Sequence, residues 1–368
     1  MKVLIVSGIW PPDVGGPASH APEVAAFLRS RGHVVEAAVT ADAEPAAQPY
    51  PVHWVDRSLP PGIRHARSVQ LLAARARRAD VIYTTGMFGR SSAAAALART
   101  PLVVKLTADP AYERAKRWGL FDGSIAQFQA RPPASTLPLR LLRDADVRRA
   151  SHAVFPSAYL QEIALGWGLT PDDVSLLPNP TPPIPELPPR DELRARFRFE
   201  GPTLVFAGRL TTQKALEVAL DAVGRVDGVE LVVAGDGPDR AKLEAIGGAR
   251  FLGPQTRRQV LELFRAADAG LLSSSWENFP HVVVECLAIG TPFISTDAGG
   301  VTEVVTDGEN GLIVPVNDPA ALAAAIERYV ADPALQERLR AAAAPSVERF
   351  APEHVYGRLE RILLEAAG

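Results

Sequence analysis

Residues 274–285 read Ser-Ser-Trp-Glu-Asn-Phe-Pro-His-Val-Val-Val-Glu, which places two carboxylates, Glu277 and Glu285, eight positions apart. The apolar run Ala-Gly-Leu-Leu at 269–272 comes just before and predicts a buried strand. Pro280 suits the first position of a helix, where its missing N–H would have no partner anyway. The stretch therefore predicts a strand, a loop that holds Glu277, and a helix that holds Glu285.

A strand–loop–helix unit of this kind suits an anionic ligand. The backbone N–H groups and the positive end of the helix point toward one spot, which favours a diphosphate. The two carboxylates would repel such an anion, so we expect them to accept hydrogen bonds from hydroxyl groups. Groups that carry both phosphate and many hydroxyls are sugars and riboses.

Length and composition indicate a two-domain enzyme. A chain of 368 residues is too long for one ordinary core. It is 47% hydrophobic and 22% charged, which is typical of soluble globular proteins. Cys286 is the single cysteine, so no intrachain disulfide can form, and a reducing cytoplasm fits. No apolar run approaches the roughly 20 residues that span a bilayer, and the first residues predict a strand and not a signal peptide.

The net charge of −3 conceals an asymmetry between the halves. Residues 1–180 hold 20 Lys and Arg against 15 Asp and Glu, whereas the remainder holds 19 against 27. A basic first half could face an anionic membrane or a phosphorylated acceptor, or it could be an ordinary solvated surface. Nucleic acid is not an expected partner.

A proline-rich segment divides the chain. Seven of the thirteen residues in 178–190 are proline, which excludes a helix or a central strand and predicts a stiff hinge. Domains are expected at 1–180 and 191–345, and the helical tail at about 346–368 could pack on either. In the second half, strands are predicted at 203–207, 229–234, 250–252, 270–273, 292–296 and 311–314.

The first half has the same alternation of strands and helices. Strands are predicted at 2–7, 34–39, 81–84, 102–106 and 153–156, and helices at 21–31, 68–78 and 139–150. Alternation of this kind predicts an α/β fold with two Rossmann-like, doubly wound parallel sheets that face each other across a cleft. Ligands of such sheets bind at the carboxyl ends of the strands.

Three loops carry candidate ligand-binding residues. Gly208 and Arg209 follow a predicted strand, and Lys214 comes just before a helix, where a phosphate would lie. Arg can hold phosphate with two parallel hydrogen bonds, and Lys adds a compact charge. Adjacent glycines at 15–16 would let the backbone approach a ligand closely. The loop at 250–253 could hold a nucleobase, or it could be a plain strand end.

In these motifs the chain resembles the retaining glycosyltransferases of family four, which have the GT-B fold. The resemblance covers nearly all of the chain, from the Pro-Pro-Asp-Val-Gly-Gly loop to the final helix. Its most specific elements are Gly-Arg-Leu at 208–210 with Lys214, and the spacing of Glu277 and Glu285. It implies that the second domain binds a nucleotide-sugar donor, that the first binds the acceptor, and that the last helix returns to the first domain.

The resemblance also implies roles for individual residues. Arg209 and Lys214 would clamp the donor diphosphate and stabilise charge on the departing phosphate oxygen. Glu277 would contact the transferred sugar, and Glu285 would bind the ribose hydroxyls. No metal or other cofactor is expected, and a UDP-sugar is favoured over a GDP-sugar. The remaining residues expected to bind the donor are Gly15, Gly16, Gly208, Leu252, Asn278, Phe279, Pro280 and His281.

Acceptor residues are expected in the first domain. His20, at the start of the first helix, is a candidate contact. Many family members have a histidine in the loop that holds Thr107 and Asp109, and Thr107 cannot relay a proton in the same way. Asp109 could bind an acceptor group or cap the helix that starts at Pro110. A second departure from the family is Ala215, since a glycine commonly follows the phosphate-binding lysine.

The expected reaction is transfer of a hexosyl or N-acetylhexosaminyl group with retention. The acceptor would carry a hydroxyl and could be a sugar, a lipid-linked molecule or a phosphorylated one. A nicotinamide dehydrogenase is disfavoured, because Gly235-Asp-Gly237 lacks the third glycine of the dinucleotide fingerprint. A GT-B sugar-nucleotide epimerase and a non-catalytic nucleotide-sugar-binding protein stay open as alternatives.

Overall fold

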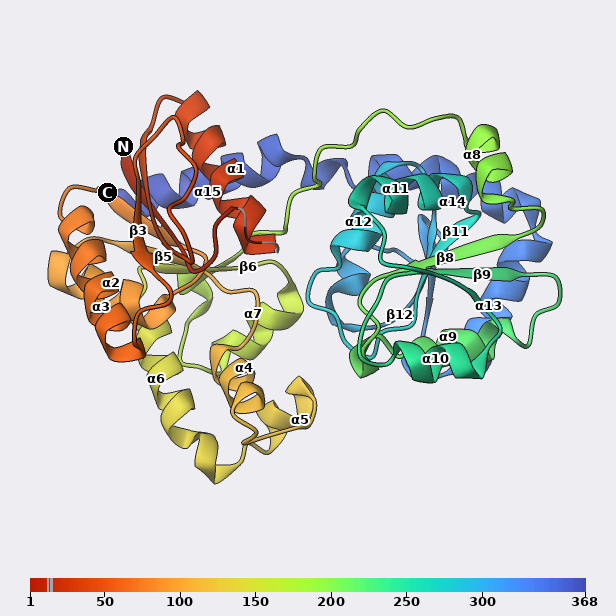
Figure 1. Ribbon diagram of the computed structural model, residues 1–368, viewed down its shortest axis with the longest axis horizontal. Coiled ribbons are helices and arrows are strands. Elements are labelled where there is room, and N and C mark those ends of the chain that lie inside the picture. The colour runs from red at the N-terminus through yellow and green to blue at the C-terminus, as the bar shows by residue number, and fades with distance from the viewer. Residues whose placement is uncertain (12, 14–15) are drawn as a thin grey trace. The chain divides into compact units, whose positions relative to one another are not determined.

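The computed structural model describes residues 1–11, 13 and 16–368, and it divides into two units. The first unit comprises Met1–Pro178 together with Glu353–Gly368, and the second comprises Asn179–Pro352. The boundary at 178–179 falls at the start of the proline-rich segment. The last helix, α15 (Pro352–Ala367), lies beside α1 (Gly16–Ser30) (Figure 1), where Tyr356 Oη donates to Glu23 Oε2 at 2.7 Å.

Among the described residues of the first unit, seven parallel strands form one sheet with the order β3-β2-β1-β4-β5-β6-β7. The chain order reverses between β1 and β4, so this is the point at which loops diverge and a ligand can enter. The strands are β1 (Lys2–Ser7), β2 (Val34–Ala41), β3 (Val52–Asp56), β4 (Val81–Thr84), β5 (Leu102–Lys105), β6 (His152–Phe155) and β7 (Val174–Leu176).

Helices cover both faces of this sheet because the side chains of its buried strands alternate between two cores. Val3 and Ile5 of β1 pack in a core with α1 and α15, whereas Leu4 and Val6 pack in a core on the opposite face. The other helices of the unit are α2 (Pro61–Ala76), α3 (Phe88–Ala98), α4 (Pro110–Arg117), α5 (Ile125–Ala130), α6 (Leu137–Arg148) and α7 (Ala158–Leu165).

The sheet of the second unit repeats this topology with six described strands in the order β10-β9-β8-β11-β12-β13. Its reversal lies between β8 and β11. Figure 1 shows α9 and α10 on one side of the sheet and α11 and α12 on the other. The strands are β8 (Thr203–Ala207), β9 (Glu230–Ala234), β10 (Arg250–Gly253), β11 (Ala269–Leu272), β12 (Phe293–Thr296) and β13 (Gly311–Val314). The helices are α8 (Arg190–Phe197), α9 (Leu216–Val223), α10 (Arg240–Ile246), α11 (Arg257–Ala266), α12 (His281–Ala288), α13 (Pro319–Ala331) and α14 (Pro333–Ser346).

The predicted fold class, two doubly wound parallel sheets, is confirmed. The predicted strands of the second unit all form, with ends that differ by one residue at most. Two strands of the first unit were not predicted, β3 and β7. Both lie at the edges of the sheet, and β7 has only three residues, so neither carries a long apolar run. Helices α3, α5 and α7 were also missed, whereas the helix expected to start at Pro110 forms as α4. Helix α2 starts seven residues before its predicted start at 68.

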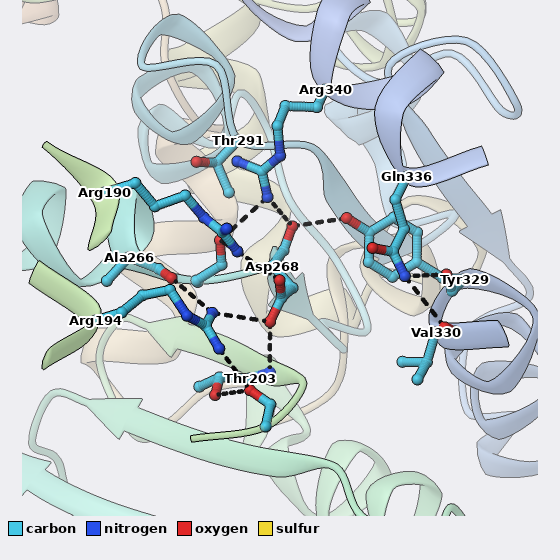
Figure 2. A network of polar contacts seen from close by, with 12 residues as sticks. Arg190, Arg194, Thr203, Ala266, Asp268, Thr291, Tyr329, Val330, Gln336 and Arg340 are labelled. Carbon is cyan, nitrogen blue, oxygen red and sulfur yellow. Dashed lines mark hydrogen bonds and ion pairs between the residues drawn. The ribbon is translucent and has the colours of Figure 1, made fainter. Parts of the chain in front are cut away.

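A polar network at the amino ends of β8 and β11 ties three helices to the second sheet (Figure 2). The carboxylate of Asp268 accepts hydrogen bonds from Arg190 at 2.5 Å, from Arg194 at 3.2 Å and from the Thr203 amide at 2.8 Å. Its main-chain carbonyl accepts from Tyr329 at 2.7 Å and from Arg340 at 2.9 Å. One residue therefore joins α8, α13, α14 and two neighbouring strands.

In the part of the chain that the structure describes, no helix combines the length and the apolar character that crossing a membrane requires.

Candidate functional site

The second unit brings four of the predicted residues to one edge of its sheet. Arg209 and Lys214 follow β8, and Glu277 and Glu285 follow β11, which is paired with β8. Since both strands end at the same edge and the chain order reverses between them, their loops meet where doubly wound sheets bind ligands.

The loop at 208–214 is hydrogen-bonded to the end of β9 and to the turn that follows it. Gly208 N donates to the Ala234 carbonyl at 3.0 Å, and Leu210 N donates to the Asp236 carbonyl at 2.9 Å. A Cβ atom at Gly235 would lie 1.9 Å from the Gly208 carbonyl oxygen, so no larger residue fits there. In the sequence, Gly235 stood out only as part of an incomplete dinucleotide fingerprint. In the structure, the absence of a side chain at Gly235 lets the loop at 208–214, the candidate phosphate-binding loop, pack closely on the turn after β9.

Lys214 and Glu277 form an ion pair. Ser274 Oγ donates to the same carboxylate oxygen of Glu277 at 2.6 Å, and the lysine and glutamate side chains are 18% and 9% exposed. Ser273 Oγ fixes the loop by donating to the carbonyls of Lys214 and Ala215 at 3.1 and 3.0 Å. Two residues predicted for different ligand groups thus contact each other directly.

Ala215 has a left-handed backbone conformation, with φ 44°. For an alanine this conformation costs on the order of 1 kcal/mol, a cost that glycine avoids. The positive φ explains why a glycine suits position 215. The small energetic cost explains why an alanine is tolerated there.

Arg209 is exposed. Over the described ranges, its side chain forms no ion pair and no hydrogen bond. A guanidinium in this state can turn toward an incoming anion without breaking an existing contact.

Glu285 lies one helical turn into α12 and is paired with Arg257, the first residue of α11, at 2.5 Å between Nε and Oε1. The glutamate side chain is 12% exposed and the arginine side chain is 44% exposed. The start of α11 is fixed by a capping box between Thr256 and Gln259. Sequence reasoning missed Arg257, since nothing local links it to a residue 28 positions away.

The segment between the two glutamates differs from the prediction in detail. Pro280 is the N-cap of α12 and the helix begins at His281, so the proline lies one position earlier than predicted. The Phe279 side chain is buried and packs perpendicular to Phe350, with ring centroids 5.3 Å apart. Only the main chain of Phe279 can therefore contribute to a donor site. Asn278 and His281 lie in the same turn and are half-buried and exposed, respectively.

Other backbone contacts shape this edge of the sheet. Gly300 N donates to the Glu277 carbonyl at 3.0 Å, and Gln213 Nε2 donates to the Trp276 carbonyl at 2.8 Å. Neither Gly300 nor Gln213 was singled out in the sequence. Leu252, expected beside a nucleobase, is half-buried, and its carbonyl accepts a hydrogen bond from Gln255 Nε2 at 3.0 Å.

The acceptor candidates of the first unit separate into three environments. His20 is buried, and its Nε2 lies 2.8 Å from Tyr83 Oη, so it belongs to the packing of α1 on the sheet. Asp109 is fully buried and caps α4 through the amides of Ala111 and Tyr112. Thr107, by contrast, is exposed and lines a cavity of about 900 Å³.

The burial of Asp109 favours the helix cap over an acceptor contact. Its second carboxylate oxygen accepts hydrogen bonds from Arg143 at 2.7 Å and from Gln129 at 2.8 Å. All of its acceptor capacity is directed toward the protein. Of the two predicted glycines, Gly16 is the first residue of α1 and Gly15 lies outside the described residues.

No group of three or more His, Cys, Asp or Glu side chains in the described ranges is arranged to hold a metal ion. The chain has one Asp-x-Asp triplet, at 144–146. It lies within α6, and Asp144 is paired with Arg143 at 2.7 Å.

Comparisons with known proteins divide the chain at the same place. The family model described as glycosyl transferases group 1 matches residues 189–345, and a glycosyl transferase 4-like domain matches residues 15–180. Together the two models account for most of both units.

Individual relatives give the same assignment. Alpha-D-kanosaminyltransferase of Streptomyces kanamyceticus is 31% identical over 168 residues, which are 42% of this chain and 44% of that protein. The match thus spans less than half the length of that relative. D-inositol 3-phosphate glycosyltransferase of Xylanimonas cellulosilytica is 28% identical over 92% of this chain and 88% of its own. The solved structure of Anabaena HepE in complex with UDP has a TM-score of 0.79 at 20% identity, and the match covers 99% of this chain and 100% of that one.

Proposed function

Because the chain belongs to the GT-B glycosyltransferases of family four, we propose that it transfers a sugar from a nucleotide-sugar donor to a hydroxyl-bearing acceptor, with retention of configuration. The observation that supports this most is the meeting of Arg209, Lys214, Glu277 and Glu285 at the carboxyl ends of β8 and β11. This set combines cations for a diphosphate with carboxylates for hydroxyl groups.

The donor is proposed to bind along this edge of the second sheet. Arg209 and Lys214 would hold the diphosphate, Glu277 the transferred sugar and Glu285 the ribose. A UDP-sugar is favoured over a GDP-sugar, and the UDP complex of Anabaena HepE supports that choice. The base would lie near Leu252, and main-chain amides of 278–281 would hold the sugar and phosphate. A role for Gly15 and Gly16 over the diphosphate stays a prediction.

The Lys214–Glu277 pair need not break when the donor binds. An ammonium group has three N–H donors, so Lys214 can keep Glu277 and still donate to a phosphate oxygen. The pair would then fix both side chains before the reaction, and pre-oriented charges cost no reorganisation as the transition state forms.

Catalysis would come from charge stabilisation on the leaving group. Negative charge grows on the departing phosphate oxygen, so Arg209 and Lys214 would bind the transition state more tightly than the ground state. That phosphate can also take the proton of the acceptor hydroxyl, and no carboxylate is then required as a general base. A hexosyl or N-acetylhexosaminyl group and independence from metal ions are part of the proposal.

The acceptor is proposed to bind the first unit and to be a sugar, a lipid-linked molecule or a phosphorylated one. The proposed setting is the cytoplasm, and the excess of basic residues in 1–180 supports a contact with an anionic membrane face.

The proposal is tested by thermal stabilisation with UDP, GDP, ADP and TDP and their common sugar conjugates, in the presence of EDTA. A ligand that binds the folded state raises the melting temperature according to its concentration relative to its Kd. We expect the nucleotides of one base to raise the melting temperature clearly, and we expect that base to be uracil, as in UDP. A folded sample that no nucleotide stabilises would contradict the donor site.

Replacing Glu285 with alanine is expected to weaken UDP binding by about 10- to 100-fold, because hydrogen bonds to a charged acceptor contribute about 1.5–3 kcal/mol. The measurement is the Kd of the free nucleotide by isothermal titration calorimetry. Glu244→Ala is the matched control, since Glu244 is a more exposed carboxylate that also pairs with an arginine, Arg240, at 2.8 Å on α10. Equal affinities in the wild type and the Glu285 variant would exclude the ribose role.

A further inference from the structure

The cavity beside Thr107 lies within the first unit, at the carboxyl ends of β4 and β5. Residues of the loops after both strands line it, together with residues of α2, α3 and α4. Its volume of about 900 Å³ is within the range of small-molecule sites, and its position at the carboxyl ends of parallel strands is where such sheets bind ligands.

The walls of this cavity are positively charged. Arg90 of α3 and Arg114 and Arg117 of α4 line it, along with one carboxylate, Glu113. Within the described residues, none of the three arginines has a carboxylate at ion-pair distance. Some other arginines of the unit are paired, as Arg57 is with Asp13 and Asp42. The cavity therefore holds three arginines and one carboxylate, and among the described residues none of the three arginines is in an ion pair.

Arg90 is the most enclosed of the three. Among the described residues, its guanidinium donates a hydrogen bond to Ser68 Oγ at 3.2 Å. Burial lowers the pKa of its guanidinium to about 10, and repulsion from Arg64 and Arg114 adds to this. Holding like charges together in a half-buried site is unfavourable unless an anion occupies it.

A neutral hydroxyl in the same cavity also lacks a partner. Thr85, in the loop after β4, is 8% exposed, and its buried Oγ1 has no hydrogen-bond partner among the described residues. Buried hydroxyls in native proteins are nearly always hydrogen-bonded, so this lining residue keeps an unused polar group beside the cavity. This observation is independent of the arginine cluster and points to the same kind of occupant.

We propose that this cavity binds the acceptor through an anionic group, a phosphate or phosphate ester, held by Arg90, Arg114 and Arg117. The inference rests on the proposed function, since it makes the cavity the acceptor site of the transferase. The planar fork of an arginine matches two oxygens of a phosphate, and three such groups around one cavity select for that geometry over a neutral sugar. Thr107, which is exposed and lines the cavity, then supplies a hydroxyl for a further polar atom of the ligand.

The first test titrates inorganic phosphate into the full chain and follows the phosphorus NMR line width and the melting temperature. Replacing both Arg90 and Arg114 with glutamine is expected to raise the Kd for phosphate at least about tenfold, since each removes a charge-assisted hydrogen bond. The Arg209→Ala variant, which changes the donor loop, should keep this phosphate binding. Phosphate affinity that is unchanged by the Arg90 and Arg114 substitutions, or that disappears with Arg209 alone, overturns the proposal.

Arg77→Gln with Arg78→Gln is the matched control. It removes the same charge from exposed positions just after α2 that do not line the cavity, and its phosphate affinity should stay within about twofold of the wild type. If the Arg90 and Arg114 variant does not fold, Arg117→Gln replaces it, because Arg117 is exposed at the last residue of α4. An unaltered phosphate Kd in the folded Arg117 variant would equally overturn the proposal.

Measurements of UDP binding distinguish a failure of the anion site from a failure of the proposed donor site. The Arg90 and Arg114 variant should bind UDP as tightly as the wild type. If phosphate binding depends on these arginines while no nucleotide binds to any variant, the proposed transferase function fails and the anion site stands.

A second arm identifies the source of the anionic group. The wild type and the Arg90 and Arg114 variant are floated with vesicles of phosphatidylcholine, with and without phosphatidylglycerol. Loss of phosphatidylglycerol-dependent flotation in the variant supports a lipid headgroup. Flotation that does not depend on the arginines, with phosphate binding that does, supports a soluble phosphate ester.

Discussion

Replacing Arg209 with alanine lowers the turnover number by about 10²- to 10³-fold at saturating donor and acceptor, which is the usual loss when one preorganised donor to a developing oxyanion is removed. Arg209 is exposed, and across the described residues no side chain or carbonyl is bonded to its guanidinium. The substitution therefore leaves no buried group unpaired, and we expect the melting temperature to change by no more than about 2 °C. Transfer is measured by release of the nucleoside diphosphate under single-turnover and steady-state conditions.

Two further variants make the Arg209 result specific. Arg225→Ala removes an exposed arginine in the same unit, just after α9, and should leave turnover unchanged. Arg209→Lys keeps the charge without the planar fork and should recover part of the rate. A melting temperature that collapses while the folded fraction turns over normally would show that Arg209 is structural.

Replacing Asp268 with alanine is expected to cost about 2–4 kcal/mol of unfolding free energy and to lower the melting temperature by about 5–15 °C. The loss leaves Arg190 and Arg194 without their shared carboxylate and the Thr203 amide without its acceptor (Figure 2). The side chains of these two arginines are 32% and 18% exposed, so solvent screens part of the effect, and we place the value below that of a fully buried pair. The measurement is urea denaturation followed by circular dichroism.

The control for Asp268 is Asp221→Ala, which breaks an exposed pair between Asp221 and Arg225 at the end of α9. Exposed pairs contribute about 0–1 kcal/mol, so this variant should denature almost with the wild type. The network lies at the amino ends of the strands, whereas the candidate site lies at their carboxyl ends. The fraction of the Asp268 variant that stays folded should therefore bind UDP with the affinity of the wild type. Coincident denaturation curves for the two variants would exclude a structural role of the network.

The positions of the candidate site residues could be predicted from local pattern. Glu277 lies in a loop after a short apolar strand and Glu285 within the next helix, and Arg209 and Lys214 follow another strand in the same way. Parallel strands expose all their carboxyl ends at one edge of the sheet, so residues at these positions come together wherever the strands are neighbours. The boundary between the two units at 178–179 could be predicted because consecutive prolines exclude helix and sheet.

The short edge strands could not be predicted in the same way. β3 and β7 pair with only one neighbour each, so they need neither a continuous apolar run nor a strict alternation. Their sequences, Val-His-Trp-Val-Asp and Val-Ser-Leu, become strands because a neighbouring strand offers its free edge.

The alternation of strands and helices, the proline-rich boundary and the residues at strand ends all follow from spacings of a few positions along the chain. The pairing of charges does not, because it depends on which strands are adjacent and on which helices pack beside them. Glu277 is paired with Lys214, 63 positions away, and Asp109 is enclosed by Arg143, 34 positions away. Folding brought these partners together, and it also placed Arg90, Arg114 and Arg117 around one cavity, where none of them forms an ion pair among the described residues. The sequence pattern shows where a charged residue lies along a helix, strand or loop. The groups that surround that charged side chain are decided only when the chain packs.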